Sequence, residues 1–141
     1  MTMKKLFFLM AFVALANVGH GQQVTAAAAP TAPKADFAVF ETSSLNHDFG
    51  KIKQGTPVTH EFTFTNKGKV PLVITNVAPS CGCTTPDWTR DPIAPGGQGF
   101  IKATFNAAAP GAFNKSVTVT TNIEAGFVQL FIKGEVATDI P

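Results

Sequence analysis

Residues 58–65 of the chain read Val-Thr-His-Glu-Phe-Thr-Phe-Thr, and this stretch decides the fold class. Successive side chains of a β-strand point to opposite faces of the sheet, so apolar residues at every second position predict a strand with one buried face. Threonine and glutamate fill the positions between and are expected to face solvent. The residues predicted to face the core are Val58, His60, Phe62 and Phe64.

The same period of two recurs in three later segments. Their predicted inward residues are Ile101, Ala103 and Phe105, then Val117 and Val119, then Val128, Leu130, Ile132 and Val136.

A further segment breaks the alternation once. Leu72 and Ile74 share a face, whereas Val77 is out of step with them. One extra residue in a strand restores the alternation, so we expect a β-bulge near Thr75 or Asn76 that returns Val77 to the core.

Glycine and proline turn signals divide these segments at intervals of about 8 to 15 residues, which is typical of an antiparallel sandwich. With an irregular first strand around Phe37 to Thr42, and with Phe49 and Ile52 closing the edge, the count reaches about seven strands. The sequence therefore predicts an all-β, immunoglobulin-like antiparallel sandwich. The chain contains no tyrosine and only two cysteines, two residues apart, so the tyrosine corner and the intersheet disulfide of antibody domains are excluded.

The N-terminal segment is typical of a secretory signal peptide. Lys4 and Lys5 precede an apolar run from Leu6 to Ala16, which is too short to span a bilayer, and small residues follow it. We expect a signal peptide over residues 1–21, a disordered Ala/Pro-rich linker over 22–36 and the folded domain over 37–138. The mature protein would then be exported, periplasmic or extracellular, without a membrane anchor.

The charge balance argues against polyanionic partners. The chain has 11 Lys and Arg against 9 Asp and Glu, and removal of Lys4 and Lys5 leaves 9 against 9. Affinity for nucleic acid or anionic membranes comes mainly from basic residues that neutralise phosphates. A neutral mature chain gives no reason to expect either partner.

Several motifs together resemble the bacterial family called domain of unknown function 1573, over about residues 40 to 136. The most specific is Ser-Cys-Gly-Cys-Thr at residues 80–84, after Pro-Leu-Val-Ile at 71–74. The others are His-Asp-Phe-Gly-Lys-Ile at 47–52 followed by Gly55, Phe-Thr-Phe-Thr-Asn-Lys-Gly at 62–68, and Ile-Ala-Pro-Gly at 93–96. The resemblance implies an immunoglobulin-like sandwich similar to the modules of major sperm protein and of centrosomal and ciliary proteins. It implies no activity.

The pair Cys81 and Cys83 is the one constellation that suggests chemistry. On an extended strand their Cα atoms would lie roughly 6.6 Å apart, near the upper limit for a disulfide, and Gly82 permits a tighter turn. Exported cysteines usually pair. A three-residue loop gains only about 1.6 kcal/mol from chain entropy, however, so such a bond is a weak global staple.

Four interpretations of this pair stay open. The first is a local clamp on one turn, and the second is a labile thiol pair that exchanges with a redox partner. The third is binding of a soft metal such as Cu(I) or Zn(II), although two thiolates supply only half a tetrahedral set. Unpaired buried thiols are the fourth. No resident cofactor is expected.

Three aromatic residues are candidates for a partner surface. Phe127 and Phe131 fall on the outward parity of the last strand and predict an apolar patch, unless the first strand or the linker covers them. Trp88 either stacks on a ligand from a loop or caps the open end of the sandwich. His60 is expected to be a core histidine satisfied by the backbone rather than a ligand.

No catalytic motif is present: there is no G-x-S-x-G elbow, phosphate-binding glycine loop or H-E-x-x-H helix. The sequence thus favours a non-enzymatic module for protein binding or assembly in the cell envelope. The alternative is a thiol redox or soft-metal protein that uses the Cys-Gly-Cys turn.

Overall fold

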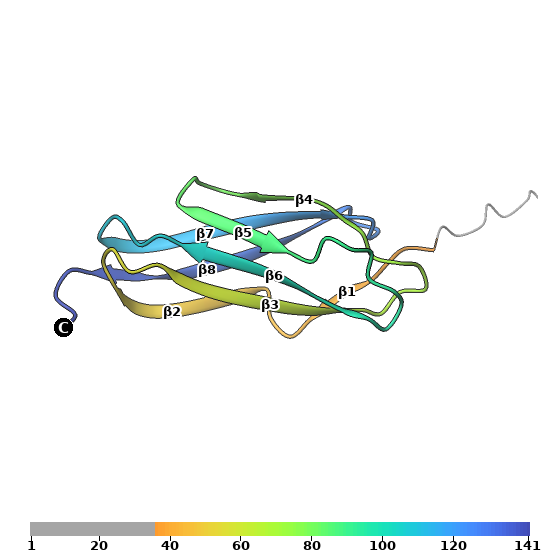
Figure 1. Ribbon diagram of the computed structural model, residues 1–141, viewed down its shortest axis with the longest axis horizontal. Helices are drawn as coiled ribbons and strands as arrows, with labels where there is room; N and C mark the ends of the chain where they lie inside the picture. Colours follow the sequence, from red (N-terminus) through yellow and green to blue (C-terminus); the bar gives the residue numbers. More distant parts are fainter. Residues whose placement is uncertain (1–35) are drawn as a thin grey trace, which may run out of the picture. The chain divides into compact units, whose positions relative to one another are not determined.

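The computed structural model describes residues 36–141, which form eight β-strands (Figure 1). The predicted signal peptide, 1–21, and the predicted linker up to residue 35 lie outside the described residues. No helix in the described part of the chain is long and apolar enough to cross a membrane. The strands are β1 (Phe40–Thr42), β2 (Asn46–Lys53), β3 (Val58–Asn66), β4 (Ile74–Pro79), β5 (Thr84–Trp88), β6 (Gln98–Phe105), β7 (Gly111–Thr121) and β8 (Phe127–Ala137).

The strands form two four-stranded sheets, in the orders β1-β3-β6-β5 and β2-β8-β7-β4 (Figure 1). Apolar side chains from both sheets form one core between them. The predicted all-β, immunoglobulin-like sandwich is thus confirmed. Every pair of neighbouring strands is antiparallel except β2 and β8, which run parallel.

That parallel pair corrects the prediction of a wholly antiparallel arrangement. After β1 the chain leaves the first sheet, and β2 joins the second sheet alongside the final strand. The strand count also exceeds the predicted number of about seven, because residues Thr84–Trp88 form a strand. The sequence pattern did not predict this strand, since it contains Pro86. Proline is tolerated on an edge strand, where its missing N–H can face outward, and β5 lies at the edge of its sheet.

The predicted inward faces are largely confirmed. Val77 is 6% exposed, and the register of β4 against β7 shifts between Ile74 and Asn76, which places the predicted bulge at Thr75. Val58, His60 and Val128 are only half-buried, because they lie near strand ends or at the open side of the sandwich. The predicted inward residues that are buried are Phe62, Phe64, Leu72, Ile74, Ile101, Ala103, Phe105, Val117, Val119, Leu130, Ile132 and Val136.

Asn66, fully buried at the end of β3, connects three segments. Its side-chain oxygen accepts hydrogen bonds from the backbone N–H groups of Val39 at 3.3 Å and Gly68 at 2.9 Å. Its side-chain nitrogen donates to the carbonyls of Val70 at 2.8 Å and Ile93 at 2.9 Å. A buried amide with four partners satisfies both its own polar atoms and backbone groups that strand pairing leaves free.

Candidate functional site

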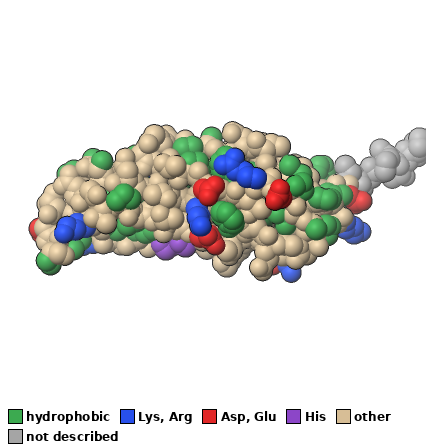
Figure 2. Space-filling model, viewed as in Figure 1, with side chains coloured by type: hydrophobic (Ala, Val, Ile, Leu, Met, Phe, Trp, Pro, Cys, Tyr) green, Lys and Arg blue, Asp and Glu red, His purple; other side chains and the backbone are tan. Residues whose placement is uncertain are grey.

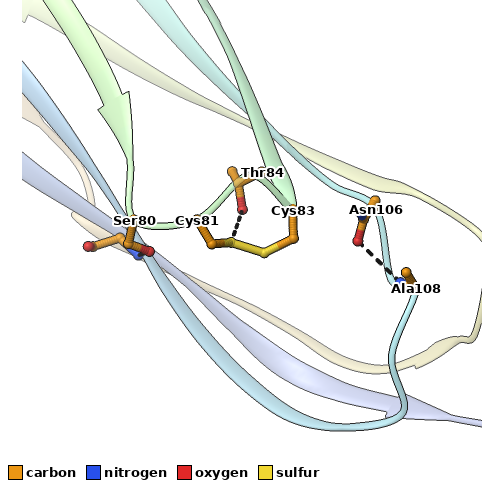
Figure 3. The surroundings of a disulfide bond; sticks show 7 residues. Ser80, Cys81, Cys83, Thr84, Asn106 and Ala108 are labelled. Carbon is orange, nitrogen blue, oxygen red and sulfur yellow. Dashed lines mark hydrogen bonds between the residues drawn. A yellow bond between two sulfur atoms is a disulfide. The ribbon is translucent and has the colours of Figure 1, made fainter.

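The turn Cys81-Gly82-Cys83 connects the edge strand β4 of one sheet to the edge strand β5 of the other. Its two cysteines form a disulfide, with Cα atoms 5.3 Å apart (Figure 3). This distance is shorter than the roughly 6.6 Å of an extended strand, since these residues adopt a turn. The structure therefore answers the question of pairing that the sequence leaves open.

Hydrogen bonds hold this disulfide turn to both sheets. On the β7 side, Ser80 N donates to Ser116 O at 2.8 Å, and Ser116 N donates to Ser80 Oγ at 3.1 Å. On the β6 side, Asn106 N donates to Cys83 O at 3.0 Å. The turn thus fixes the crossing between the two sheets at one end of the sandwich.

A hollow of about 220 Å³ lies next to Cys83. Phe105 and Phe113 contribute to its lining, as does the loop after β6, which passes beside Cys83 in Figure 3. Lys115 of β7 also lines it, whereas Cys81 does not. The two cysteines therefore have different surroundings: one borders an open, largely apolar hollow with a cation, and the other does not.

Two histidines form a second cluster, which sequence reasoning missed. His47 of β2 and His60 of β3 stack with their ring centroids 3.6 Å apart and their planes 7° from parallel. Phe49 and Phe62 contact this pair edge-on, at 4.5 Å from His47 and 4.6 Å from His60. The pair joins the two sheets at an open side of the sandwich, and Figure 2 shows histidine atoms at the surface there.

The prediction of a backbone-satisfied core histidine at position 60 is wrong. His60 is half-buried, and among the described residues no hydrogen bond to its ring is found. Burial lowers the pKa of His60 below its ordinary value of 6.5, the adjacent His47 lowers it further, and Glu61 raises it. The parity of β3 indicated that His60 faces inward, but nothing in the sequence indicated that β2 would bring His47 against it.

Trp88 is the last residue of β5 and is half-buried against the core. The guanidinium carbon of Arg90 lies 3.5 Å from the centre of the Trp88 ring, and Arg90 also reaches Asp87 at 3.8 Å. The indole ring thus packs against the core, and the Arg90 guanidinium lies over the ring in a cation–π contact. Trp88 belongs to the sheet β1-β3-β6-β5, apart from the other two predicted surface aromatics.

Phe127 and Phe131 lie four residues apart on β8, both on the outer face of the sheet β2-β8-β7-β4. Phe127 is 52% exposed, the largest fraction among the exposed large hydrophobic residues of the described chain, and Phe131 is half-buried. They pair with Thr120 and Ser116 of β7, respectively. Strand β1 does not cover them, because it pairs with β3 in the other sheet.

Potential metal ligands do not gather in the part of the chain that the structure describes. No group of three or more His, Cys, Asp or Glu side chains lies together among residues 36–141. The charged side chains are dispersed, with basic and acidic groups side by side on the face shown in Figure 2. Three ion pairs are found among these residues: Arg90–Asp87, Lys102–Glu61 and Lys133–Asp48.

The two sheets and the disulfide turn define the class of protein: an immunoglobulin-like β-sandwich whose sheets are joined by a Cys-Gly-Cys turn. A family model described as "Protein of unknown function (DUF1573)" matches residues 40–136. The chain belongs to this family, which confirms the resemblance found in its motifs. No curated protein matches the sequence.

Solved structures share the fold. A protein of unknown function from Porphyromonas gingivalis W83 matches with a TM-score of 0.65 and 21% identity, over 76% of this chain and 50% of its own. The chain thus spans half the length of that protein. The ASH / PapD-like domain 7 of human CEP192 matches with a TM-score of 0.59 and 10% identity, over 72% of this chain and 87% of its own. A Vibrio cholerae protease, VesB, matches with a TM-score of 0.56 and 15% identity, over 70% of this chain and 32% of its own.

Proposed function

We propose that this chain is an exported, non-catalytic module that binds another protein of the cell envelope. The observation that carries the proposal is the exposed phenyl ring of Phe127, with Phe131 four residues further along β8 on the same sheet face. Solvent-exposed aromatic side chains are enriched at protein interfaces, because their burial removes a large apolar area from water.

The surroundings of these two rings support a protein partner. We call the patch the Phe127 surface. Ser116, Thr118 and Thr120 of β7 alternate with buried residues and so face outward beside it, as does Gln129 of β8. The patch therefore combines two aromatic rings with hydroxyl and amide groups, and the Lys133–Asp48 ion pair borders it on the same sheet face. This chemistry suits apolar and hydrogen-bonding side chains of another polypeptide rather than a polyanion. Its members are Ser116, Thr118, Thr120, Phe127, Gln129 and Phe131.

Export is supported by the sequence of residues 1–21 alone. The basic residues, the short apolar run and the small residues that follow are in the order of a signal peptide. The disulfide agrees with an oxidising compartment, where structural disulfides persist. We place the mature protein in the periplasm or outside the cell, with Gln22 as its first residue.

Site-specific photocrosslinking in intact cells tests the proposal. A photoreactive phenylalanine analogue replaces Phe127 in one variant and Thr85 in the control. Thr85 is also exposed, but it lies on β5 in the opposite sheet. We expect irradiation to give one discrete adduct with another envelope protein from position 127 and none from position 85.

A second substitution tests whether the surface acts as a unit. Phe131→Ser in the Phe127 crosslinking variant is expected to reduce adduct formation strongly, because neighbouring aromatic residues bury area together. The same adduct from both positions 127 and 85, or none from position 127, argues against this surface. A chain found with residues 1–21 intact in the cytoplasm argues against export.

A further inference from the structure

We propose that the Cys81–Cys83 disulfide exchanges with a thiol of another polypeptide, that the incoming thiolate attacks the sulfur of Cys83, and that the sulfur of Cys81 leaves. This activity is independent of the Phe127 surface. It rests on three differences between the surroundings of the two sulfurs.

Access is the first difference. Cys81 and Cys83 are both half-buried, and Gly82 between them is exposed. Only Cys83 borders the hollow of about 220 Å³, whose phenylalanine, alanine and proline lining can receive the apolar side chains next to an incoming cysteine. Since thiol exchange requires approach of the nucleophile to one sulfur, this geometry directs attack to Cys83.

Stabilisation of the leaving sulfur is the second difference. The Oγ1 atom of Thr84 lies 3.9 Å from the Sγ atom of Cys81 (Figure 3). A disulfide sulfur carries no hydrogen, so the hydroxyl must be the donor in this long contact. The contact strengthens when the sulfur becomes a thiolate, because hydrogen bonds to ionised acceptors are shorter and stronger. Thr84 is 2% exposed, so little water competes for its hydroxyl.

Charge is the third difference. Lys115 lines the hollow together with Cys83 and belongs to none of the three ion pairs found among the described residues. A nearby ammonium group favours the thiolate form of a cysteine, and the thiolate is the reactive species. Lys115 therefore attracts the incoming thiolate to the hollow.

The backbone contacts of the turn make the exchange reversible. Ser80 is bonded to Ser116, and the carbonyl of Cys83 accepts from Asn106 N at 3.0 Å. None of these bonds involves a sulfur atom. They keep the two cysteines close after the disulfide opens, so that it can close again.

The exchange proceeds in two balanced steps. A partner thiolate attacks the Cys83 sulfur, a partner–Cys83 disulfide forms, and Cys81 leaves as a thiolate. A second cysteine thiolate of the partner then attacks the partner sulfur that is bonded to Cys83. This step forms a disulfide within the partner and releases the Cys83 thiolate. The partner dithiol loses two electrons and becomes a disulfide, Cys81 and Cys83 gain them, and both thiolates take protons from solvent.

Reduced glutathione is the probe, because it has one thiol per molecule and the first step can be trapped by quenching before a second glutathione attacks the mixed disulfide. The oxidised full chain is mixed with millimolar glutathione at neutral pH, free thiols are blocked with N-ethylmaleimide, and fragment-ion mass spectrometry locates each group. We expect glutathione on Cys83 and the maleimide on Cys81. Glutathione on Cys81, or equally on both, overturns the assigned direction of attack. A chain that carries neither glutathione nor the maleimide on either cysteine has kept its disulfide closed, which overturns the exchange activity and leaves a structural role only.

Two substitutions test the roles of the neighbours. Lys115→Gln is expected to slow formation of the mixed disulfide several-fold, whereas Lys69→Gln, which changes an exposed lysine between β3 and β4, leaves the rate unchanged. Thr84→Val is expected to weaken the preference for Cys83. Equal rates for the two lysine variants contradict the role of Lys115. The site of attack in the wild-type chain is measured without any variant, so the central proposal does not depend on their folding.

Discussion

Asn66 is the residue on which the local structure around the end of β3 depends most. Its amide has four hydrogen-bond partners, in the segments before β1, after β3 and before β6. A buried donor or acceptor left without a partner costs about 1–3 kcal/mol. Removal of the amide leaves Val39 N, Gly68 N and Val70 O, all part-buried, without this partner, whereas Ile93 O still accepts from Leu72 N at 2.8 Å.

We therefore expect Asn66→Ala to lower the free energy of unfolding by about 3 kcal/mol, since three part-buried backbone groups lose their partner at once. Asn122→Ala is the matched control, because Asn122 is exposed and its amide makes only two bonds, to Val73 N and Pro71 O. We expect about 1 kcal/mol for the control. Denaturant unfolding measures both values, and equal losses contradict the role assigned to Asn66.

The stacked histidines predict a dependence of stability on pH. The folded chain holds the pKa of His60 below its value in the unfolded chain, so unfolding takes up protons. The contribution of neutral His60 to the free energy of unfolding is fully present above about pH 6.5, the ordinary histidine pKa. This contribution is lost as the pH falls through the lowered pKa of the folded state.

His60→Phe is expected to keep the aromatic contacts with His47 and Phe62 and to flatten this dependence between about pH 7 and 5, above the range where most carboxylates titrate. His47→Phe is expected to flatten it only in part, because burial, the main cause of the shift, remains. The measurement is the unfolding midpoint of the wild type and of each variant as a function of pH across this range. Identical slopes for wild type and His60→Phe would show that His60 is not the titrating group.

At the scale of elements, the alternation of the strands could be predicted because it depends on local sequence alone. Even the bulge at Thr75 followed from one residue out of step, Val77. Strand β5 was missed, since its stability comes from pairing with β6 and its own sequence contains Pro86. The parallel pairing of β2 with β8 was missed for a related reason: it joins segments at opposite ends of the domain.

The candidate site shows the same limit. The spacing of Cys81 and Cys83 indicated a possible disulfide, and the parity of β8 placed Phe127 outward. The contact of His47 with His60 and the hollow that Lys115 shares with Cys83 depend on how the two sheets pack. No local pattern carries that information.

The disulfide turn is an element whose effect on stability should be small. A three-residue loop restricts the unfolded chain little, so we expect the double variant Cys81→Ala/Cys83→Ala to lose only about 1.6 kcal/mol. Hydrogen exchange should accelerate at residues 80–84 and stay unchanged in β8. A loss of several kcal/mol, or faster exchange throughout both sheets, would make the disulfide a global staple instead.

At the scale of the whole molecule, the two faces of the sandwich differ. The outer face of β1-β3-β6-β5 carries the Lys102–Glu61 and Arg90–Asp87 ion pairs. The opposite outer face carries the Lys133–Asp48 ion pair on β8 and β2 and, next to Lys133, the Phe127 surface on β7 and β8. Exposed aromatic residues on the outer face of a sheet suit a stable protein contact.

The most direct test of this account is the affinity of the mature chain for the envelope protein that is crosslinked at position 127. We compare the wild-type chain with Phe127→Ser/Phe131→Ser and with Thr85→Ala on the opposite sheet. The account predicts that the double variant raises the Kd by about 30-fold or more, as expected for loss of an interface hot spot of about 2 kcal/mol. Thr85→Ala should leave the Kd unchanged. Equal Kd values for the wild-type chain and the double variant, with both chains folded, would contradict it.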